Sequence, residues 1–123
     1  MTFILSVDDS QAIRQMVDAT LSSSGYQVIS AENGLHGLEA AGGQSFDLVI
    51  SDVNMPEMGG YDFVRALRKI EEYAHVPVLM LTTEFEDRHK KAGRDAGANG
   101  WIIKPIDPDQ LLRAVQRVVG RPD

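Results

Sequence analysis

The sequence predicts an α/β fold in which a doubly wound, five-stranded parallel sheet is flanked by five helices. Five short apolar runs alternate with five amphipathic stretches, which is the pattern of repeated βα units. Two of the runs, 46–50 and 78–81, are almost entirely apolar, as expected for strands that helices cover on both faces. Four of the five runs also end in a polar residue with useful chemistry, and parallel strands gather such residues along one edge of the sheet.

The five strands are expected at 3–7, 26–31, 46–51, 78–81 and 101–103. The runs at 46–50 and 78–81 are predicted to be central strands because they are apolar with only one or two polar interruptions nearby. Residues 26–31 alternate more between apolar and polar side chains, which indicates a strand nearer the edge of the sheet.

The first helix is expected to begin near Ser10, with Asp9 or Ser10 as its N-cap, and to stop at Gly25. A second, short helix is expected after Asn33. Spacing of three and four residues puts one side of the first helix against the sheet. That side carries Ile13, Met16, Val17, Thr20 and Leu21.

The third helix is predicted from about Gly60 to Glu72, and its buried face consists of Phe63, Val64, Leu67 and Ile70. The last helix opens with Asp107 as a cap, Pro108 at the first helical position and Gln110 three residues beyond the cap. Its expected buried side chains are Leu111, Leu112, Val115, Val118 and Val119.

The fourth helix, roughly Glu86 to Ala96, is unusual because it has almost nothing to bury. Its only apolar side chains are Ala92 and Ala96, and it contains Gly93. We expect it to be the least stable element of the fold and therefore able to move.

Length and composition indicate one cytoplasmic domain. A chain of 123 residues buries a core without disulfides, and no second domain is expected. The absence of cysteine excludes a thiolate nucleophile and thiolate-held zinc, and it fits a reducing compartment. No apolar stretch reaches the ~18 residues of a membrane span, and the first residues do not resemble a secretory signal.

The charge is unevenly distributed along the chain. A net charge of −6 argues against nucleic-acid binding, but residues 88–123 hold eight of the twelve basic residues and only four acids. This part of the chain is either an ordinary solvated surface or a docking face for an acidic partner segment.

Acidic, hydroxyl and basic residues stand where the apolar runs end. Asp8 and Asp9 follow the first run, Asp52 the third, Thr82 the fourth and Lys104 the fifth. Parallel strands end at the same edge, where ligands of open α/β sheets bind. This group of side chains suits Mg²⁺-assisted transfer of a phosphoryl group.

The proposed chemistry follows from the residue types. Asp9 and Asp52 are candidate Mg²⁺ ligands, with Asp8 orienting a bound water. Repulsion among these carboxylates is expected to raise the pKa of at least one of them, so that Mg²⁺ stabilises the fold. Asp52 is the candidate nucleophile toward phosphorus, while Lys104 and Thr82 interact with phosphate oxygens. Taken singly, each residue also has a plain structural explanation as a cap, a strand residue or a solvated lysine.

These motifs together resemble the receiver domains of bacterial two-component response regulators, and among them the single-domain chemotaxis regulators of the CheY type. The similarity covers essentially the whole chain. It rests on four segments in order, Val7-Asp8-Asp9-Ser10, Ser51-Asp52-Val53-Asn54-Met55-Pro56, Leu81-Thr82-Thr83-Glu84 and Trp101-Ile102-Ile103-Lys104-Pro105. The resemblance implies the strand order 2-1-3-4-5.

The resemblance also implies specific roles. Asp52 would be the phosphoacceptor, phosphorylated by a histidine kinase, and Asp9, Asp52 and the backbone carbonyl of Asn54 would bind Mg²⁺, with Asp8 acting through water. Thr82 and Lys104 would contact the phosphoryl group, and the Lys104–Pro105 peptide bond would be cis. Phosphorylation would draw Thr82 inward and repack Trp101, changing the face formed by the fourth helix, fifth strand and fifth helix.

The expected partner of that face is a separate protein, most simply a flagellar motor switch protein, and we expect a monomer that binds neither DNA nor membrane. With no residues beyond 123, output through a fused DNA-binding domain is not expected. A phosphate sink, or a regulatory role in another pathway, is the alternative within the family.

Three positions are expected to tune how water reaches the acyl phosphate. Asn54 and Glu84 resemble the chemotaxis members, which predicts rapid loss of phosphate, whereas Thr83 is larger than usual and restricts access. The chain also departs from the family pattern at Gly59, at Trp101 and at Ile106, where Asp, a smaller aromatic residue and Phe are common.

Two other classes of function fit the sequence less well than the switch. A phosphohydrolase of the haloacid dehalogenase type would carry a second Asp two residues after the nucleophile, and Asn54 stands there, so the proton shuttle is missing. A binding module that no longer uses phosphate would not need the acidic residues, Thr82 and Lys104. Nucleotide binding lacks a glycine loop after the first strand, and His36, His75 and His89 lack metal-binding spacing. The switch is therefore not an ordinary enzyme, although it catalyses its own phosphotransfer and dephosphorylation.

Overall fold

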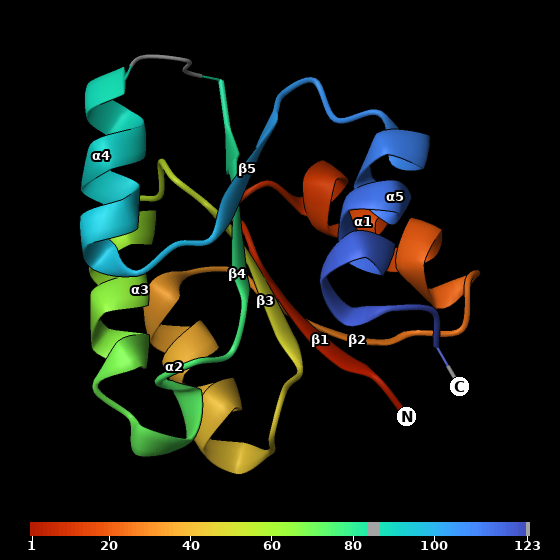
Figure 1. Cartoon of the computed structure of the whole chain (residues 1–123), viewed down its shortest axis with the longest axis horizontal. Coiled ribbons are helices and arrows are strands. Elements are labelled where there is room, and N and C mark those ends of the chain that lie inside the picture. The colour runs from red at the N-terminus through yellow and green to blue at the C-terminus, as the bar shows by residue number, and fades with distance from the viewer. Residues whose placement is uncertain (84–86, 123) are drawn as a thin grey trace.

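Five parallel strands form one sheet in the order β2-β1-β3-β4-β5 (Figure 1). The computed structural model describes residues 1–83 and 87–122, with side chains described outside 87–90. The strands are β1 (Phe3–Val7), β2 (Gln27–Ala31), β3 (Leu48–Asp52), β4 (Val78–Thr82) and β5 (Gly100–Ile103). This confirms the doubly wound sheet and the order that the resemblance implied.

Burial along the strands follows their place in the sheet. Every residue of β3 and of β4 is buried, because helices cover both faces of these strands. On the edge strand β2, three of five residues are exposed. The register pairs Val7 with Ser51, Asp52 with Leu81 and Thr82 with Ile103, so the carboxyl ends of neighbouring strands lie level.

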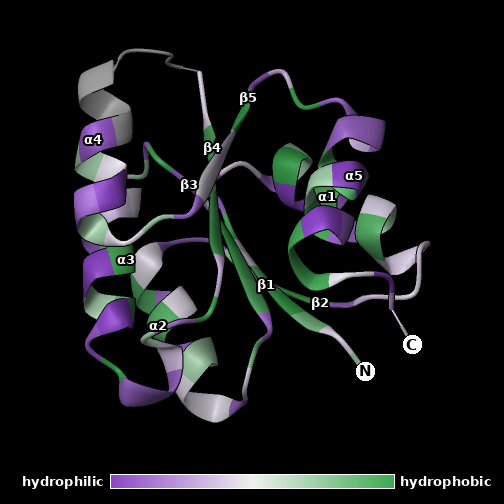
Figure 2. Cartoon of the chain, viewed as in Figure 1, coloured by the Kyte–Doolittle hydropathy of each residue, from purple (hydrophilic) through white to green (hydrophobic). Residues whose placement is uncertain are grey.

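Helices cover both faces of the sheet, as Figure 1 shows. One face carries α1 (Gln11–Ser22) and α5 (Pro108–Val119), and the other carries α2 (Gly34–Gly43), α3 (Gly60–Arg68) and α4 (Asp87–Ala96). Each interface holds an apolar cluster. The cluster under α1 and α5 includes Ile4, Ile50 and Leu111, and the cluster under α2, α3 and α4 includes Leu5, Val49 and Phe63. In Figure 2 the strands are mostly hydrophobic, whereas the described part of α4 is largely hydrophilic.

The helix caps follow the sequence signals. The Ser10 hydroxyl accepts a hydrogen bond from the Ile13 amide at 3.3 Å, so Ser10 rather than Asp9 is the N-cap of α1. Asn33 caps α2 through the His36 amide, and Asp107 caps α5 through the Asp109 amide.

Two expectations about helices were wrong. The third helix ends at Arg68 rather than Glu72, because the amides of Lys69 and Ile70 bond three residues back and a 3₁₀ turn, η1 (Glu71–Tyr73), follows. This turn buries Tyr73, whose hydroxyl lies 2.7 Å from the Gln44 carbonyl oxygen, while Ile70 is only half-buried. Val118 is 37% exposed because β5 is an edge strand and no further strand covers this side of α5.

α4 packs through small residues, and an arginine holds its C-terminal end. Gly93 and Ala96 are buried. The Arg68 guanidinium on α3 donates to the Gly97 carbonyl at 2.6 Å and to the Tyr73 carbonyl at 2.8 Å. The expected start of this helix at Glu86 lies outside the described residues.

The two ends of the described chain meet beside β2. The amide of Gln27 donates to the Thr2 carbonyl at 2.9 Å, and the Tyr26 hydroxyl donates to the Gly120 carbonyl at 2.6 Å. Both ends lie at the bottom of the sheet in Figure 1, away from the carboxyl ends of the strands. Within the described residues, no helix has the length and apolar character needed to cross a membrane.

Candidate phosphoryl and metal site

Three carboxylates meet at the carboxyl ends of β1 and β3. Asp8 and Asp9 follow β1 and Asp52 is the last residue of β3, and one oxygen from each lies within 4.8 Å of the others. Asp8 and Asp52 are buried, with exposed fractions of 0% and 4%, whereas Asp9 is exposed. The expected acidic cluster is therefore present, with a buried floor and one carboxylate toward solvent.

Asp8 is held by Ser10, the N-cap of α1, and by Arg14 on that helix. Its Oδ1 accepts a hydrogen bond from the Ser10 amide at 2.9 Å, and its backbone carbonyl accepts one from Arg14 Nη1 at 2.7 Å. Burial raises the pKa of the Asp8 carboxyl, the Ser10 amide partly offsets this, and the charge of Asp52 raises it further. Repulsion was the expected cause of a raised pKa, but dehydration is the larger one.

Lys104 brings a positive charge to the same place from the end of β5. Its Nζ lies 3.1 Å from Asp52 Oδ1 and 3.5 Å from Asp8 Oδ2. Burial alone lowers the pKa of Lys104, but the hydrogen bond to Asp52 and the charge of Asp8 outweigh it, so the pKa is raised. Lys104 is therefore a cation, and the peptide bond that follows it, to Pro105, is cis.

The cluster fits a small divalent cation. Asp8 Oδ2 is buried without a hydrogen-bond partner, which is costly for a carboxylate oxygen. The cluster offers carboxylate oxygens as ligands, and Lys104 contacts two of its three carboxylates. Hard cations such as Mg²⁺ prefer such oxygens, and a bound cation would reduce the repulsion among the carboxylates.

The other predicted site residues that the structure describes lie on β4, on β5 and in the loops that follow β3 and β4. Thr82 ends β4 and is buried, and its carbonyl accepts the Lys104 amide at 2.8 Å. Asn54 and Thr83 are exposed in the loops after β3 and β4. Trp101 lies on β5 and donates its indole N–H to the Tyr61 hydroxyl on α3. Glu84 lies outside the described residues.

Two residues of the site were missed in the sequence. Arg14 lies one turn inside α1, and only its spacing from Asp8 could have indicated the contact. Gly60 donates its amide to the Val53 carbonyl at 2.8 Å, and a Cβ at Gly60 would overlap the Asp52 carbonyl oxygen. The Gly59-Gly60 pair was a visible signal, but it indicated a turn rather than close packing against the acidic strand.

Comparison with known proteins decides the family. The family model of the response regulator receiver domain matches residues 4–116. The chain is a response regulator receiver domain. Its structure superposes on the chemotaxis protein CheY4 of Vibrio cholerae with a TM-score of 0.94 and 48% identity, covering 96% of this chain and 98% of that one.

Two further relatives bear on this receiver domain. Protein PilH of Pseudomonas aeruginosa is 35% identical, over 97% of this chain and 98% of its own length. The receiver domain of the sensor histidine kinase PA1611 from the same species, solved with a magnesium ion coordinated in its active site cleft, has a TM-score of 0.88 and 29% identity, covering 97% and 98%. Several other matching regulators are longer, and the chain spans about half of their length.

Proposed function

We propose that this receiver domain is a phosphorylation-operated switch in which Asp52 accepts a phosphoryl group from a histidine kinase with the help of Mg²⁺. The observation that carries the proposal is the position of Asp52 at the end of the buried β3 strand, 3.1 Å from Lys104 and within 4.8 Å of Asp8 and Asp9. We propose that residues 1–123 act as one such domain, a monomer in the cytoplasm.

The transfer is a substitution at phosphorus. An oxygen of the Asp52 carboxylate attacks the phosphorus of the kinase phosphohistidine, the P–N bond breaks, and its electron pair returns to the imidazole, which takes up a proton. Lys104 engages Oδ1, so Oδ2 is the oxygen that we assign to attack. Hydrolysis reverses the modification: a water oxygen attacks phosphorus, the P–O bond to Asp52 breaks, and inorganic phosphate leaves.

The cation supplies the positive charge that three carboxylates and a phosphoryl group require. We assign Mg²⁺ to Asp9, Asp52 and the backbone carbonyl of Asn54, with Asp8 acting through a water molecule. The Oδ2 of Asp8 supports this assignment, since this buried oxygen has no hydrogen-bond partner and only the Lys104 ammonium, 3.5 Å away, opposes its charge. The magnesium ion in the cleft of the PA1611 receiver domain supports the choice of metal.

Lys104 and Thr82 stabilise the phosphoryl group once it is attached. Phosphorylation at Oδ2 removes the negative charge of the Asp52 carboxylate beside Lys104, so the ammonium is then available to a phosphate oxygen. Thr82 moves its hydroxyl toward the phosphate, and Trp101 follows. Asn54, Thr83 and Glu84 set how quickly water reaches the phosphorus, and we expect rapid loss of phosphate. A phosphate lifetime of hours in the native protein would contradict that expectation.

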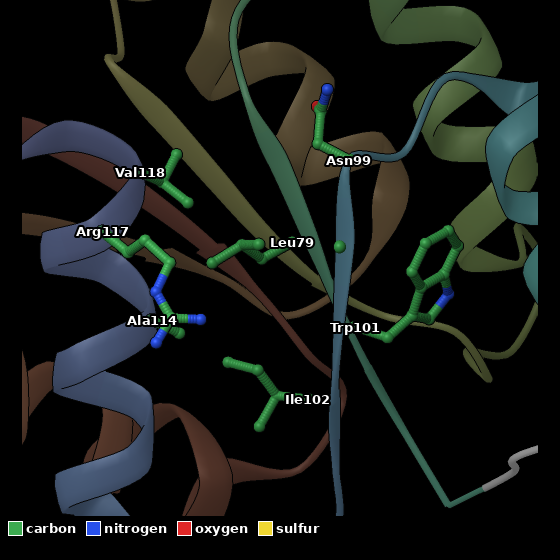
Figure 3. Close-up of a pocket in the computed structure, with 8 residues that line it drawn as sticks. Leu79, Asn99, Trp101, Ile102, Ala114, Arg117 and Val118 are labelled. Carbon is green, nitrogen blue, oxygen red and sulfur yellow. The ribbon is translucent and has the colours of Figure 1, made fainter.

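Output is assigned to the face formed by α4, β5 and α5, with a chemotaxis target such as a flagellar motor switch protein as the partner. The similarity to CheY4, a chemotaxis protein, supports this class of partner. Beside β5 a pocket of about 240 Å³ opens between Leu79, Ile102, Ala114 and Val118, with Arg117 at its border (Figure 3). An apolar groove with an exposed arginine suits an acidic partner segment.

Phosphorylation itself is tested by intact mass. The native chain and Asp52→Asn are incubated with acetyl phosphate, with and without Mg²⁺, and Asp62→Asn serves as a matched control because Asp62 is an exposed aspartate on α3. We expect one added phosphoryl group on the native chain and on Asp62→Asn, and none without Mg²⁺ or in Asp52→Asn. The proposal fails if no adduct forms with acetyl phosphate or with a phosphoramidate donor. Repeated turnover of a phosphate monoester would instead favour the hydrolase.

A further inference from the structure

Trp101 connects three elements of the domain. It is the only tryptophan of the chain and is half-buried on β5. Figure 3 shows its ring on the opposite side of β5 from α5. The indole Nε1 donates a hydrogen bond to the Tyr61 hydroxyl at 3.1 Å, which joins β5 to the first turn of α3.

Gly93 on α4 lies directly against both rings. A Cβ placed on Gly93 would lie 2.5 Å from Trp101 Cζ2 and 2.8 Å from Tyr61 Cε1, closer than non-bonded carbons approach. The two rings therefore occupy the space that a side chain at position 93 would need. The backbone of α4 rests on the hydrogen-bonded pair of aromatic residues.

The contact of Gly93 with the two rings contributes much of the packing that positions α4. In the part of α4 whose side chains are described, the buried residues are Gly93 and Ala96, and neither buries much apolar area. Arg68 fixes the carbonyl of Gly97, just beyond the C-terminal end of the helix. The middle of the helix therefore takes its position from the two rings, and a displaced Trp101 ring would leave Gly93 against the Tyr61 ring alone.

We propose that Tyr61 is a positioning residue of the output switch: by accepting the Trp101 indole N–H, its hydroxyl holds the ring against Gly93 and so fixes α4 relative to β5. A role in an output switch rests on the function proposed above, whereas the contact among Tyr61, Trp101 and Gly93 does not depend on it. The Tyr61 ring also lies against Gly93, but its hydroxyl acts through the hydrogen bond from Trp101. Without the hydroxyl, the indole N–H would turn to water and the ring would leave Gly93 more often.

The test uses the fluorescence of the single tryptophan in Tyr61→Phe, which keeps the ring and removes only the hydroxyl. Loss of one neutral hydrogen bond changes the ratio of seated to released ring about fivefold. We therefore expect acrylamide to quench Trp101 measurably faster in Tyr61→Phe than in the native chain. Tyr26→Phe is the control: it also loses one hydroxyl hydrogen bond, donated to the Gly120 carbonyl outside this contact, and its quenching should equal that of the native chain.

A second readout follows α4 directly. Hydrogen exchange of the backbone amides in 91–96 should be faster in Tyr61→Phe, while exchange in α1 stays at the native rate. Both readouts must change for the proposal to hold, and unchanged quenching or unchanged exchange overturns it. Neither requires phosphate, so a chain that fails to form the Asp52 adduct can still pass this test.

The link to the switch has its own measurement. With acetyl phosphate and Mg²⁺, Tyr61→Phe should take up the same single phosphoryl group as the native chain, because Tyr61 is outside the acidic cluster. Its Trp101 fluorescence change on phosphorylation should differ in size from the native change. An identical change would confine Tyr61 to a structural role and overturn its part in the switch.

Discussion

Asp8→Asn is expected to make the metal-free domain more stable. The attraction between Asp8 Oδ2 and Lys104 Nζ, 3.5 Å apart, is roughly 5 kcal/mol at an effective dielectric constant of about 20. Repulsion from Asp52, whose oxygen lies within 4.8 Å, is at least about 3 kcal/mol on the same scale. These opposing contributions largely cancel, and water screens the exposed Asp9.

The cost of dehydrating the buried carboxylate then decides the sign. That cost is several kcal/mol, and a neutral amide of the same shape does not incur it. The amide oxygen also keeps the hydrogen bond from the Ser10 amide. We expect Asp8→Asn to raise the free energy of unfolding by about 2 kcal/mol at pH 7 without metal. This is the part of the dehydration cost that remains after the small net attraction, Lys104 minus Asp52, is lost.

The pH dependence of that difference follows from the raised pKa of Asp8. Between its ordinary value of 3.8 and its higher value in the fold, the folded protein binds more protons than the unfolded chain, so native stability falls as the pH rises through this interval. Below the ordinary value both states are protonated, and the advantage of Asp8→Asn should shrink.

Urea unfolding in EDTA, from pH 3 to pH 8, measures the difference, and Asp18→Asn, an exposed aspartate on α1, is the control. Added Mg²⁺ should stabilise the native chain more than Asp8→Asn, because the variant has lost one carboxylate of the site. A variant less stable than the native chain at pH 7 in EDTA, or a gap that persists at acid pH, would refute the reasoning.

Two further substitutions test the packing behind the site. Gly60→Ala should destabilise the fold by about 2 kcal/mol or more because its Cβ meets the Asp52 carbonyl, whereas Gly42→Ala, with open space around it, should stabilise it by up to about 1 kcal/mol. Thermal unfolding compares the two, and equal effects would contradict the overlap. Arg68→Met should cost about 3 kcal/mol because several backbone carbonyls lose their donor, while the exposed Arg65→Met should stay within about 0.5 kcal/mol in urea unfolding. Similar losses for both arginines would count against the Arg68 contacts.

Most elements of the fold could be predicted from the sequence because the signals for them are local. Apolar runs and capping residues such as Ser10, Asn33 and Asp107 are read from neighbouring positions, and the first strand was predicted to the residue. The errors came where distant contacts decide. The 3₁₀ turn after Arg68 is set by Tyr73 reaching the backbone near Gln44, and the exposure of Val118 depends on β5 being an edge strand.

The candidate site divides in the same way. Asp8, Asp9, Asp52 and Lys104 were predicted to meet because parallel strands end at one edge, which requires only the strand pattern. Arg14, Gly60 and Tyr61 could not be predicted, since each acts through a backbone carbonyl, a close approach or a partner about 40 residues away. Their contacts depend on how the helices pack on the sheet, and no short sequence motif predicts that packing.

Hydrogen bonds hold both ends of the described chain beside β2, Thr2 to Gln27 and Gly120 to Tyr26. This has a practical consequence for building reporters from this domain. A fluorescent protein attached at either end would emerge from the base of the sheet, remote from the carboxylates and from β5. Donor and acceptor fluorophores on the two ends would sit at nearly fixed separation and report little of the proposed switch. An informative pair needs one dye at an end and the other on α4.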